Sequence, residues 1–214
     1  MANFRQAVLG CLLSVSALIM SSYIPALRSA ATPVPITTSS TPTAQSSAST
    51  QAAGFSPFSP APVGTTIETA VRCGEEPCDT KIILLDVLRG EKAWDLVKAA
   101  NSSSKSPDAG FEYLLVRIKF ELSSRTPGDK HFELTTGPLG QFAAFSADGK
   151  PYETPSIELP EPELSGTLRS GESREGWLAF LVQKADNKPL MTFSPASGAA
   201  RGQGKVVWFR LSGS

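Results

Sequence analysis

The fold is decided by the stretch EYLLVRIKFEL, residues 112–122. Every second position in it is apolar: Leu114, Val116, Ile118, Phe120 and Leu122. Three of the positions between them are charged: Arg117, Lys119 and Glu121. Because successive side chains of a β-strand point to opposite faces, this period of two predicts a strand with one buried and one solvated face.

Short apolar stretches on both sides of this strand predict further strands. They cover residues 66–72, 81–88, 132–134, 142–145, 175–182, 190–193 and 206–211. Residues 175–182 are apolar on both faces, which predicts a central strand. Asp148-Gly149 predicts a tight turn, since Gly tolerates positive φ. A set of strands spaced by Gly and Pro turns is typical of two packed antiparallel sheets, so we expect an all-β sandwich.

One segment departs from the β pattern. Residues 91–100, EKAWDLVKAA, place Ala93, Trp94, Val97 and Ala100 at helical spacing and predict one short helix. Trp94 is expected to cover one end of the sandwich core, since aromatic side chains are mainly packing residues. The alternative is that Trp94 lines a ligand groove.

Charge divides the chain into three parts. Only Arg5 and Arg28 precede Glu68, so 38 of the 40 charged side chains lie in residues 64–214. That charge density is ordinary for a soluble domain, and about 150 residues suffice for one core. We therefore expect a β-sandwich domain over residues 64–214.

The first 31 residues predict export. Arg5 is followed by an uncharged apolar run of 14 residues, Ala7–Met20, which is the length of a signal-peptide core. Ser29 and Ala31 suit cleavage after residue 31. If residues 21–27 extend the apolar helix, the segment could instead remain as a membrane anchor. Cys11 lies too early in the apolar run for a lipid-modified cysteine.

Residues 32–63 predict a disordered linker. From Ala31 to Val63 there is no charge, and the 33 residues include 13 Ser or Thr, six Pro and six Ala. Such a composition buries too little apolar surface to offset chain entropy. We expect a mobile tether that could carry O-linked sugars.

The domain also resembles a known group of proteins. The residues that carry the resemblance are Gly110–Val116, Ser146–Lys150 with Tyr152, Gly171–Ser173, Gly176–Leu178 with Phe180, and Val207–Phe209 with Leu211. In these positions residues 64–211 are similar to the bacterial immunoprotective extracellular, immunoglobulin-like group. The resemblance implies an immunoglobulin-like sandwich on an exported, often lipid-anchored protein, with no established catalytic residues.

Cys73 and Cys78, in the sequence CGEEPC, form the one close cysteine pair. In an exported chain the expected state is a disulfide that closes a small loop. The alternative is a thiol oxidoreductase site. Four intervening residues and flanking strands argue against it, because redox pairs usually have two intervening residues at a helix start.

Other catalytic and metal sites have little support in the sequence. His131 is the one histidine, which excludes zinc sites built on several imidazoles and leaves one candidate for a general base. The segment around Ser173 resembles a nucleophile elbow, but it lacks the final Gly and precedes a strand. Glu158, Glu161 and Glu163 alternate with prolines; they could hold calcium weakly, but a solvated connection is expected.

These observations predict a non-catalytic binding or adhesion module, secreted or attached to the cell envelope, without cofactor or metal. Its partner would be an envelope protein or a glycan. Nucleic acid is not expected, because 20 basic and 20 acidic residues leave no net charge. The candidate ligand surface comprises Trp94, Glu158, Glu161 and Glu163. The alternatives are the thiol oxidoreductase and a structural accessory subunit that docks through exposed edge strands.

Overall fold

The computed structural model describes residues 53–196 and 204–212. Within these ranges lie nine strands and one helix. They are β1 (Thr66–Cys73), β2 (Glu76–Arg89), α1 (Glu91–Ala100), β3 (Phe111–Ser124), β4 (His131–Leu134), β5 (Phe142–Phe145), β6 (Gly166–Arg169), β7 (Ser173–Gln183), β8 (Leu190–Phe193) and β9 (Val207–Arg210). The predicted signal peptide or anchor, residues 1–31, lies outside the described residues, as do residues 32–52 of the predicted linker.

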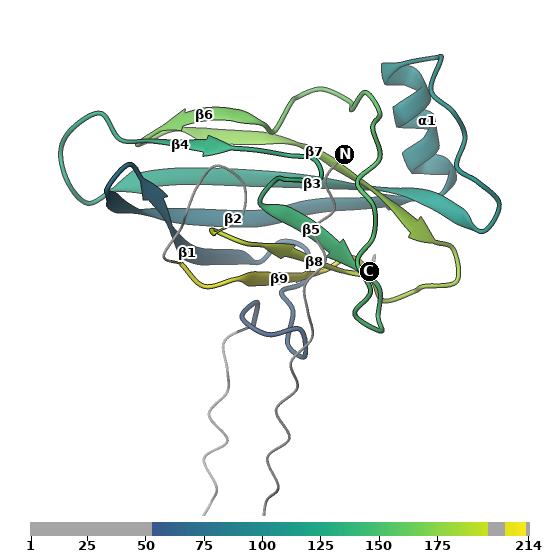
Figure 1. Ribbon diagram of the computed structural model, residues 1–214, viewed down its shortest axis with the longest axis horizontal. Coiled ribbons are helices and arrows are strands. Elements are labelled where there is room, and N and C mark those ends of the chain that lie inside the picture. The colour runs from purple at the N-terminus through teal and green to yellow at the C-terminus, as the bar shows by residue number, and fades with distance from the viewer. Residues whose placement is uncertain (1–52, 197–203, 213–214) are drawn as a thin grey trace, which may run out of the picture. The chain divides into compact units, whose positions relative to one another are not determined.

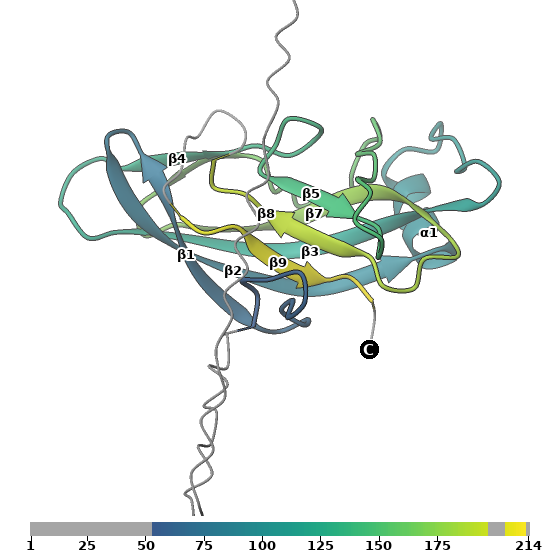
Figure 2. The ribbon, with the colours of Figure 1, turned by 60° about the horizontal axis from the view of Figure 1, so that its bottom comes forward.

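The strands form an antiparallel sandwich, as predicted (Figures 1 and 2). One layer is a four-stranded sheet with the order β1-β2-β3-β7. The other contains the three-stranded sheet β5-β8-β9 and the pair β4-β6. The main core lies between the layers and takes apolar side chains from both. The all-β sandwich with a single short helix is therefore confirmed, and the described part of the chain contains no helix long and apolar enough to cross a membrane.

Strand β3 has the alternation that its sequence predicts. Its five apolar alternate positions are at most 2% exposed and face the main core. Phe120 is fully buried in this core, where its ring lies 5.7 Å from that of Phe132 and 5.6 Å from that of Phe193. The inward face of β3 thus joins the two layers by aromatic packing.

The prediction of a central strand at residues 175–182 is wrong. β7 is the last strand of its sheet and pairs with β3 alone among the named strands. Its two faces are buried for different reasons. Phe180 faces the main core, whereas Ala179 belongs to a second apolar cluster on the outer face of the sheet. Sequence shows burial on both faces but not which elements provide it.

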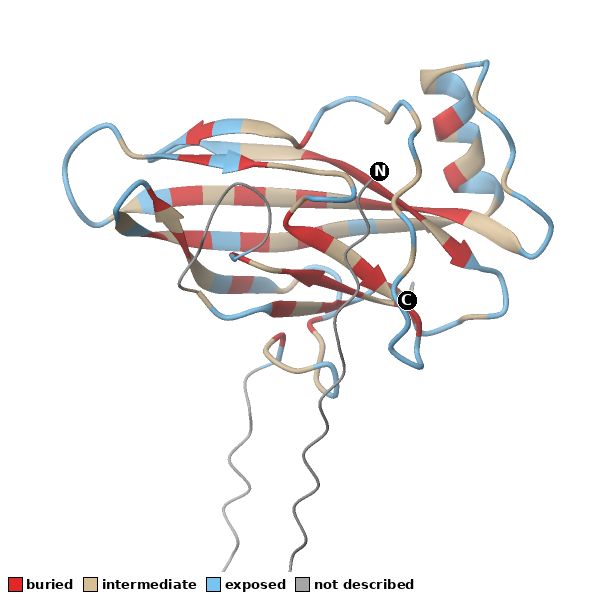
Figure 3. Ribbon diagram, in the orientation of Figure 1, coloured by how far each residue is buried: buried red, intermediate tan, exposed pale blue. Residues whose placement is uncertain are grey.

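The second cluster forms because α1 covers one end of the outer face of the four-stranded sheet (Figure 1). Ala93 and Val97 are fully buried on one side of the helix, as its red bands in Figure 3 show. The predicted helix bounds, residues 91–100, are confirmed. β6 was not predicted, because only Leu168 of its four residues is buried.

The folded domain begins before Gly64, where the sequence analysis placed its start. Ala61 is fully buried and adds a short parallel bridge to β9: its N–H donates to the carbonyl of Trp208 at 2.8 Å, and its own carbonyl accepts from Arg210 at 2.9 Å. Phe55 packs against the main core. Gly54 has a φ of 95° and lies against Ile67, where a Cβ would approach to 2.7 Å. Composition alone misses this pairing because the backbone provides it.

Candidate ligand-binding groove beside helix α1

Helix α1 follows directly from β2 through a sharp turn. Gly90 lies between them with a φ of 62°, a conformation that side-chain-bearing residues rarely adopt. The turn places Trp94 over the outer face of β3, where its ring is stacked on that of Tyr113 at 6.0 Å between centroids. Trp94 is only partly buried, so it packs on the second cluster and still reaches the surface.

An open groove of about 380 Å³ lies along this aromatic pair. Its aromatic lining residues are Trp94, Phe111 and Tyr113, and its polar lining residues are Glu91, Ser106, Glu112 and Lys184. We call it the α1 groove. An apolar floor with a few polar groups is the usual character of a ligand site, and this volume is within the range of such sites.

One hydrogen bond holds the Tyr113 ring in the floor of the α1 groove. The Tyr113 hydroxyl donates to the Lys105 carbonyl at 2.9 Å, which fixes the end of its ring. Burial raises the pKa of Tyr113, and the nearby Asp108 carboxylate raises it further. Tyr113 therefore stays neutral at physiological pH and provides an apolar ring with its polar end satisfied.

Arg89 fixes the end of β2 below the groove. Its guanidinium lies 2.6 Å from the Glu112 carboxylate and donates to the Asp186 carbonyl at 2.7 Å. Both side chains of the Arg89–Glu112 pair are largely buried. Glu112 is therefore neutralised within the fold, and the ion pair links β2 to β3 and to the loop after β7.

A second groove of about 380 Å³ adjoins the first, and Phe111 lines both. We call it the Tyr152 groove. The Tyr152 hydroxyl donates to an Asp186 carboxylate oxygen at 2.8 Å. Burial and, secondly, this hydrogen bond to an anion raise the pKa of Tyr152 to about 12. On the rim, Lys150 and then Ser146 lower the pKa of Asp148 to about 2.

The predicted acidic residues lie elsewhere. Glu158, Glu161 and Glu163 are exposed in the connection between β5 and β6 and line neither groove. Their apolar neighbours Ile157 and Leu159 pack against the second cluster. The described residues contain no group of three side chains arranged to hold a metal ion. The connection is thus a cover for the sheet with its carboxylates in water.

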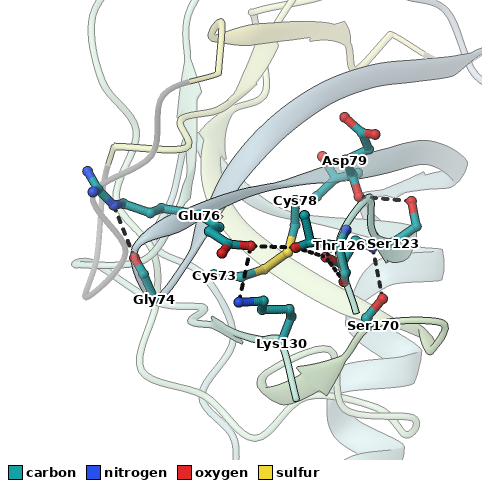
Figure 4. Close-up of a disulfide and its surroundings, with 12 residues drawn as sticks. Cys73, Gly74, Glu76, Cys78, Asp79, Ser123, Thr126, Lys130 and Ser170 are labelled. Carbon is teal, nitrogen blue, oxygen red and sulfur yellow. Dashed lines mark hydrogen bonds and ion pairs between the residues drawn. A yellow bond between two sulfur atoms is a disulfide. The ribbon is translucent and has the colours of Figure 1, made fainter. Parts of the chain in front are cut away.

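The predicted disulfide between Cys73 and Cys78 is confirmed (Figure 4). It joins the ends of β1 and β2, and both cysteines are at most 3% exposed. Glu76, in the same hairpin, accepts from Thr126 and lies 3.1 Å from the Lys130 ammonium. No helix begins at either sulfur, so the helix-start environment that is typical of a redox pair is missing from this described part of the chain.

His131 occupies the exposed first position of β4. Its imidazole makes no hydrogen bond or ion pair to any side chain that the structure describes. Ser173 is at the exposed start of β7, which begins after a turn at Gly171. These residues form no nucleophile–base–acid arrangement of the triad kind.

Sequence reasoning found Trp94 but missed the rest of the α1 groove. One signal was present. Tyr113 and Leu115 occupy the face of β3 on which the next three alternate positions are charged, and apolar residues there require a cover. The cover is α1. Phe111, Ser106 and Lys184 gave no signal, because only tertiary packing brings them together.

No family model and no curated protein matches the chain. Among solved structures, the candidate lipoprotein ycdA from Bacillus subtilis is 18% identical over 70% of this chain and 39% of its own, with a TM-score of 0.44. The chain thus spans well under half of the ycdA protein. A secreted protein from Mycobacterium tuberculosis, MPT63, is 13% identical over 71% of this chain and 97% of its own, with a TM-score of 0.43. The yjhA protein from Bacillus subtilis is 12% identical over 63% of this chain and 81% of its own, with a TM-score of 0.40.

Proposed function

We propose that the protein is an exported, non-catalytic binding or adhesion module of the bacterial cell envelope, which holds its ligand in the α1 groove. The observation that carries the proposal is the aromatic groove itself. Its floor consists of Trp94, Phe111 and Tyr113, of which Trp94 and Phe111 are partly exposed, and beside it lie Glu91 and Lys184, which have no ion-pair partner among the described residues. Partly exposed aromatic rings in a concave site are typical binding residues, since they bury a large area at low entropic cost.

The outer strands favour recognition by side chains rather than by strand addition. Ala61 covers β9, and the Glu153 carbonyl accepts from Leu181 on β7. Tyr152 donates its N–H to Ala144 on β5, and Lys205 lies against Thr69 on β1. A partner strand needs free backbone groups at a sheet edge. Other segments of the chain thus cover parts of the β5, β7 and β9 edges, whereas the contact to β1 is made by the Thr69 hydroxyl and not by the β1 backbone. The covered positions disfavour strand addition there and favour the groove.

The geometry also disfavours the thiol oxidoreductase. A reactive thiol is partly exposed and near a positive charge or a helix start. Cys78 is fully buried, and Cys73 is 3% exposed. The disulfide lies at the far end of the β2–β3 ladder from the α1 groove, because Cys78 pairs with Ser124 whereas Arg89 pairs with Leu114. We therefore assign the disulfide to stability.

Export and bacterial origin enter the proposal from the sequence. The apolar run at residues 7–20 and the uncharged segment at residues 32–52 favour a secreted or envelope-attached location. The resemblance to the immunoprotective extracellular group favours the same location and a non-catalytic role. The partner would be an envelope protein or a glycan.

The test is a binding survey with the purified full-length protein on arrays of cell-wall glycans and secreted proteins. We expect wild type to bind at least one component and Trp94→Ala to lose that binding, while Glu161→Gln, an exposed residue outside the grooves, retains it. Absence of binding on all arrays would contradict the proposal. A disulfide-exchange assay on wild type and Cys78→Ser checks the alternative, since a rate above background for wild type alone would support an oxidoreductase.

A further inference from the structure

The two grooves form one extended surface. Phe111 lines both, and the segment from Ser106 to Asp108 contributes to each: Ser106 and Pro107 line the α1 groove and Asp108 lines the Tyr152 groove. Two adjoining hollows of about 380 Å³ each can hold successive units of an elongated ligand. An elongated ligand could place one group beside Trp94 and the next beside Tyr152.

The charges along this surface are mostly acidic once internal ion pairs are set aside. Glu112 is paired with Arg89, and Asp148 is paired with Lys150 at 2.7 Å. The lining residues that then remain without an ion-pair partner among the described residues are Glu91, Asp108, Glu153 and Lys184. Three carboxylates against one ammonium leave the surface negative, although the whole chain has no net charge.

The aromatic floor, like the carboxylates, favours a positively charged ligand. The face of an indole or phenol ring carries negative electrostatic potential, so it attracts cations. Carboxylates around the rings strengthen this attraction and repel anions. After burial, the Asp108 carboxylate also raises the pKa of Tyr113, which agrees with negative charge beside the α1 groove.

From these observations we infer that the joined grooves bind an extended basic segment of a partner protein, with a lysine or arginine side chain against the exposed part of Trp94. The inference rests on the proposed function and narrows its partner from protein or glycan to a basic polypeptide. Leu181 of β7 already donates its N–H to the Glu153 carbonyl beside the Tyr152 groove, so the segment would be held by its side chains and not as an added strand.

Tryptophan indole signals provide a direct test with the full-length protein. The chain has three tryptophans, so ¹⁵N-labelled protein gives three indole N–H resonances. Hexalysine should shift the Trp94 resonance saturably and leave Trp208 unchanged. Hexaglutamate and chitohexaose should shift neither. Raising the salt from about 50 to about 500 mM should weaken hexalysine binding about tenfold, because screening shortens the reach of each charge.

Two matched pairs of substitutions separate a specific site from general attraction. Glu91→Gln with Asp108→Asn should weaken hexalysine binding about threefold or more. Glu158→Gln with Glu161→Gln removes the same charge outside the grooves and should leave binding unchanged. All four residues are exposed, so the variants should fold.

Equal weakening by the two pairs would overturn the inference, since it would indicate attraction to net charge alone. An unchanged Trp94 resonance with hexalysine would also overturn it. If chitohexaose shifts Trp94 while hexalysine does not, the basic partner is excluded and the α1 groove remains the binding site of the proposed function. The proposed function itself is tested separately, by the array survey and by the effect of Trp94→Ala on the binding found there.

Discussion

The two ends of the β2–β3 ladder are built in different ways. At one end the Cys73–Cys78 disulfide closes the hairpin, and Glu76 and Asp79 pair with Lys130 and Arg125 from the loop after β3. At the other end α1 covers the sheet with an aromatic pair and leaves two grooves open. The disulfide end pairs these charges within the chain, and its own hollows, of about 380 and 410 Å³, have no aromatic lining residue. The helix end leaves aromatic rings and carboxylates available, which is the condition for binding.

The shared core sets the scale for this comparison. Phe120 is fully buried midway between the two ends and contacts Phe132 and Phe193. Phe120→Ala should lower the free energy of unfolding by about 3–5 kcal/mol, because a large cavity replaces the ring. Chemical denaturation measures this change. A loss below about 1 kcal/mol would mean that the two layers are not joined through β3.

Removal of the disulfide should lower the stability of the fold without changing ligand binding in the α1 groove. Replacing both cysteines, Cys73→Ala with Cys78→Ala, should cost about 2 kcal/mol, as expected for opening so short a loop. Denaturation of the variant and of reduced wild type should agree. Groove binding should stay within about twofold of wild type, since the groove lies at the other end of the ladder. A tenfold or larger loss, equal to about 1.4 kcal/mol, would show that the ends are coupled.

A substitution at the helix end should have the opposite effect: a small loss of stability and a large loss of binding. Trp94→Ala should cost only about 1–2 kcal/mol of stability, because the ring is partly exposed, yet it should remove groove binding. Trp94→Phe is the matched control and should retain the stacking on Tyr113 and part of the affinity. If the alanine variant binds like wild type, the α1 groove is packing and not a site.

How much of this could be predicted from sequence differs between the two ends. The disulfide follows from the spacing of Cys73 and Cys78, and the β3 alternation and the α1 bounds follow from local periodicity. These features depend on neighbours along the chain. The groove joins Trp94, Ser106, Phe111 and Lys184 from four separate segments, so only the tertiary packing reveals it.

The errors have the same origin. The sequence correctly predicts that both faces of β7 are buried. The outer face, however, is covered by the connection from residue 151 to residue 164 and by α1, which lets β7 lie at the sheet edge. Ala61 belongs to a segment whose composition predicts disorder, yet backbone hydrogen bonds to β9 order it. Composition predicts which side chains are buried. It does not predict the edge position of β7 or the pairing of Ala61 with β9, because other segments of the chain decide both.

The smallest expected effect concerns pH at the Tyr152 groove. The folded protein raises the pKa of Tyr152 from its usual 10.0 to about 12. The neutral hydroxyl therefore stabilises the fold fully below pH 10, and this contribution is lost as the pH rises through 12. Tyr152→Phe should remove that part of the alkaline slope and change stability at neutral pH by only about 1 kcal/mol. Thermal unfolding at several alkaline pH values checks this, and an unchanged slope would contradict it.

The central claim is that the α1 end binds and the disulfide end stabilises. The most direct test measures the affinity of one ligand, taken from the array survey, for the Trp94→Ala and the Cys73→Ala/Cys78→Ala variants side by side by calorimetry. The prediction is a loss of about tenfold or more for the Trp94 variant and an unchanged affinity for the cysteine variant. The reverse result, with affinity lost only when the disulfide is removed, would contradict it.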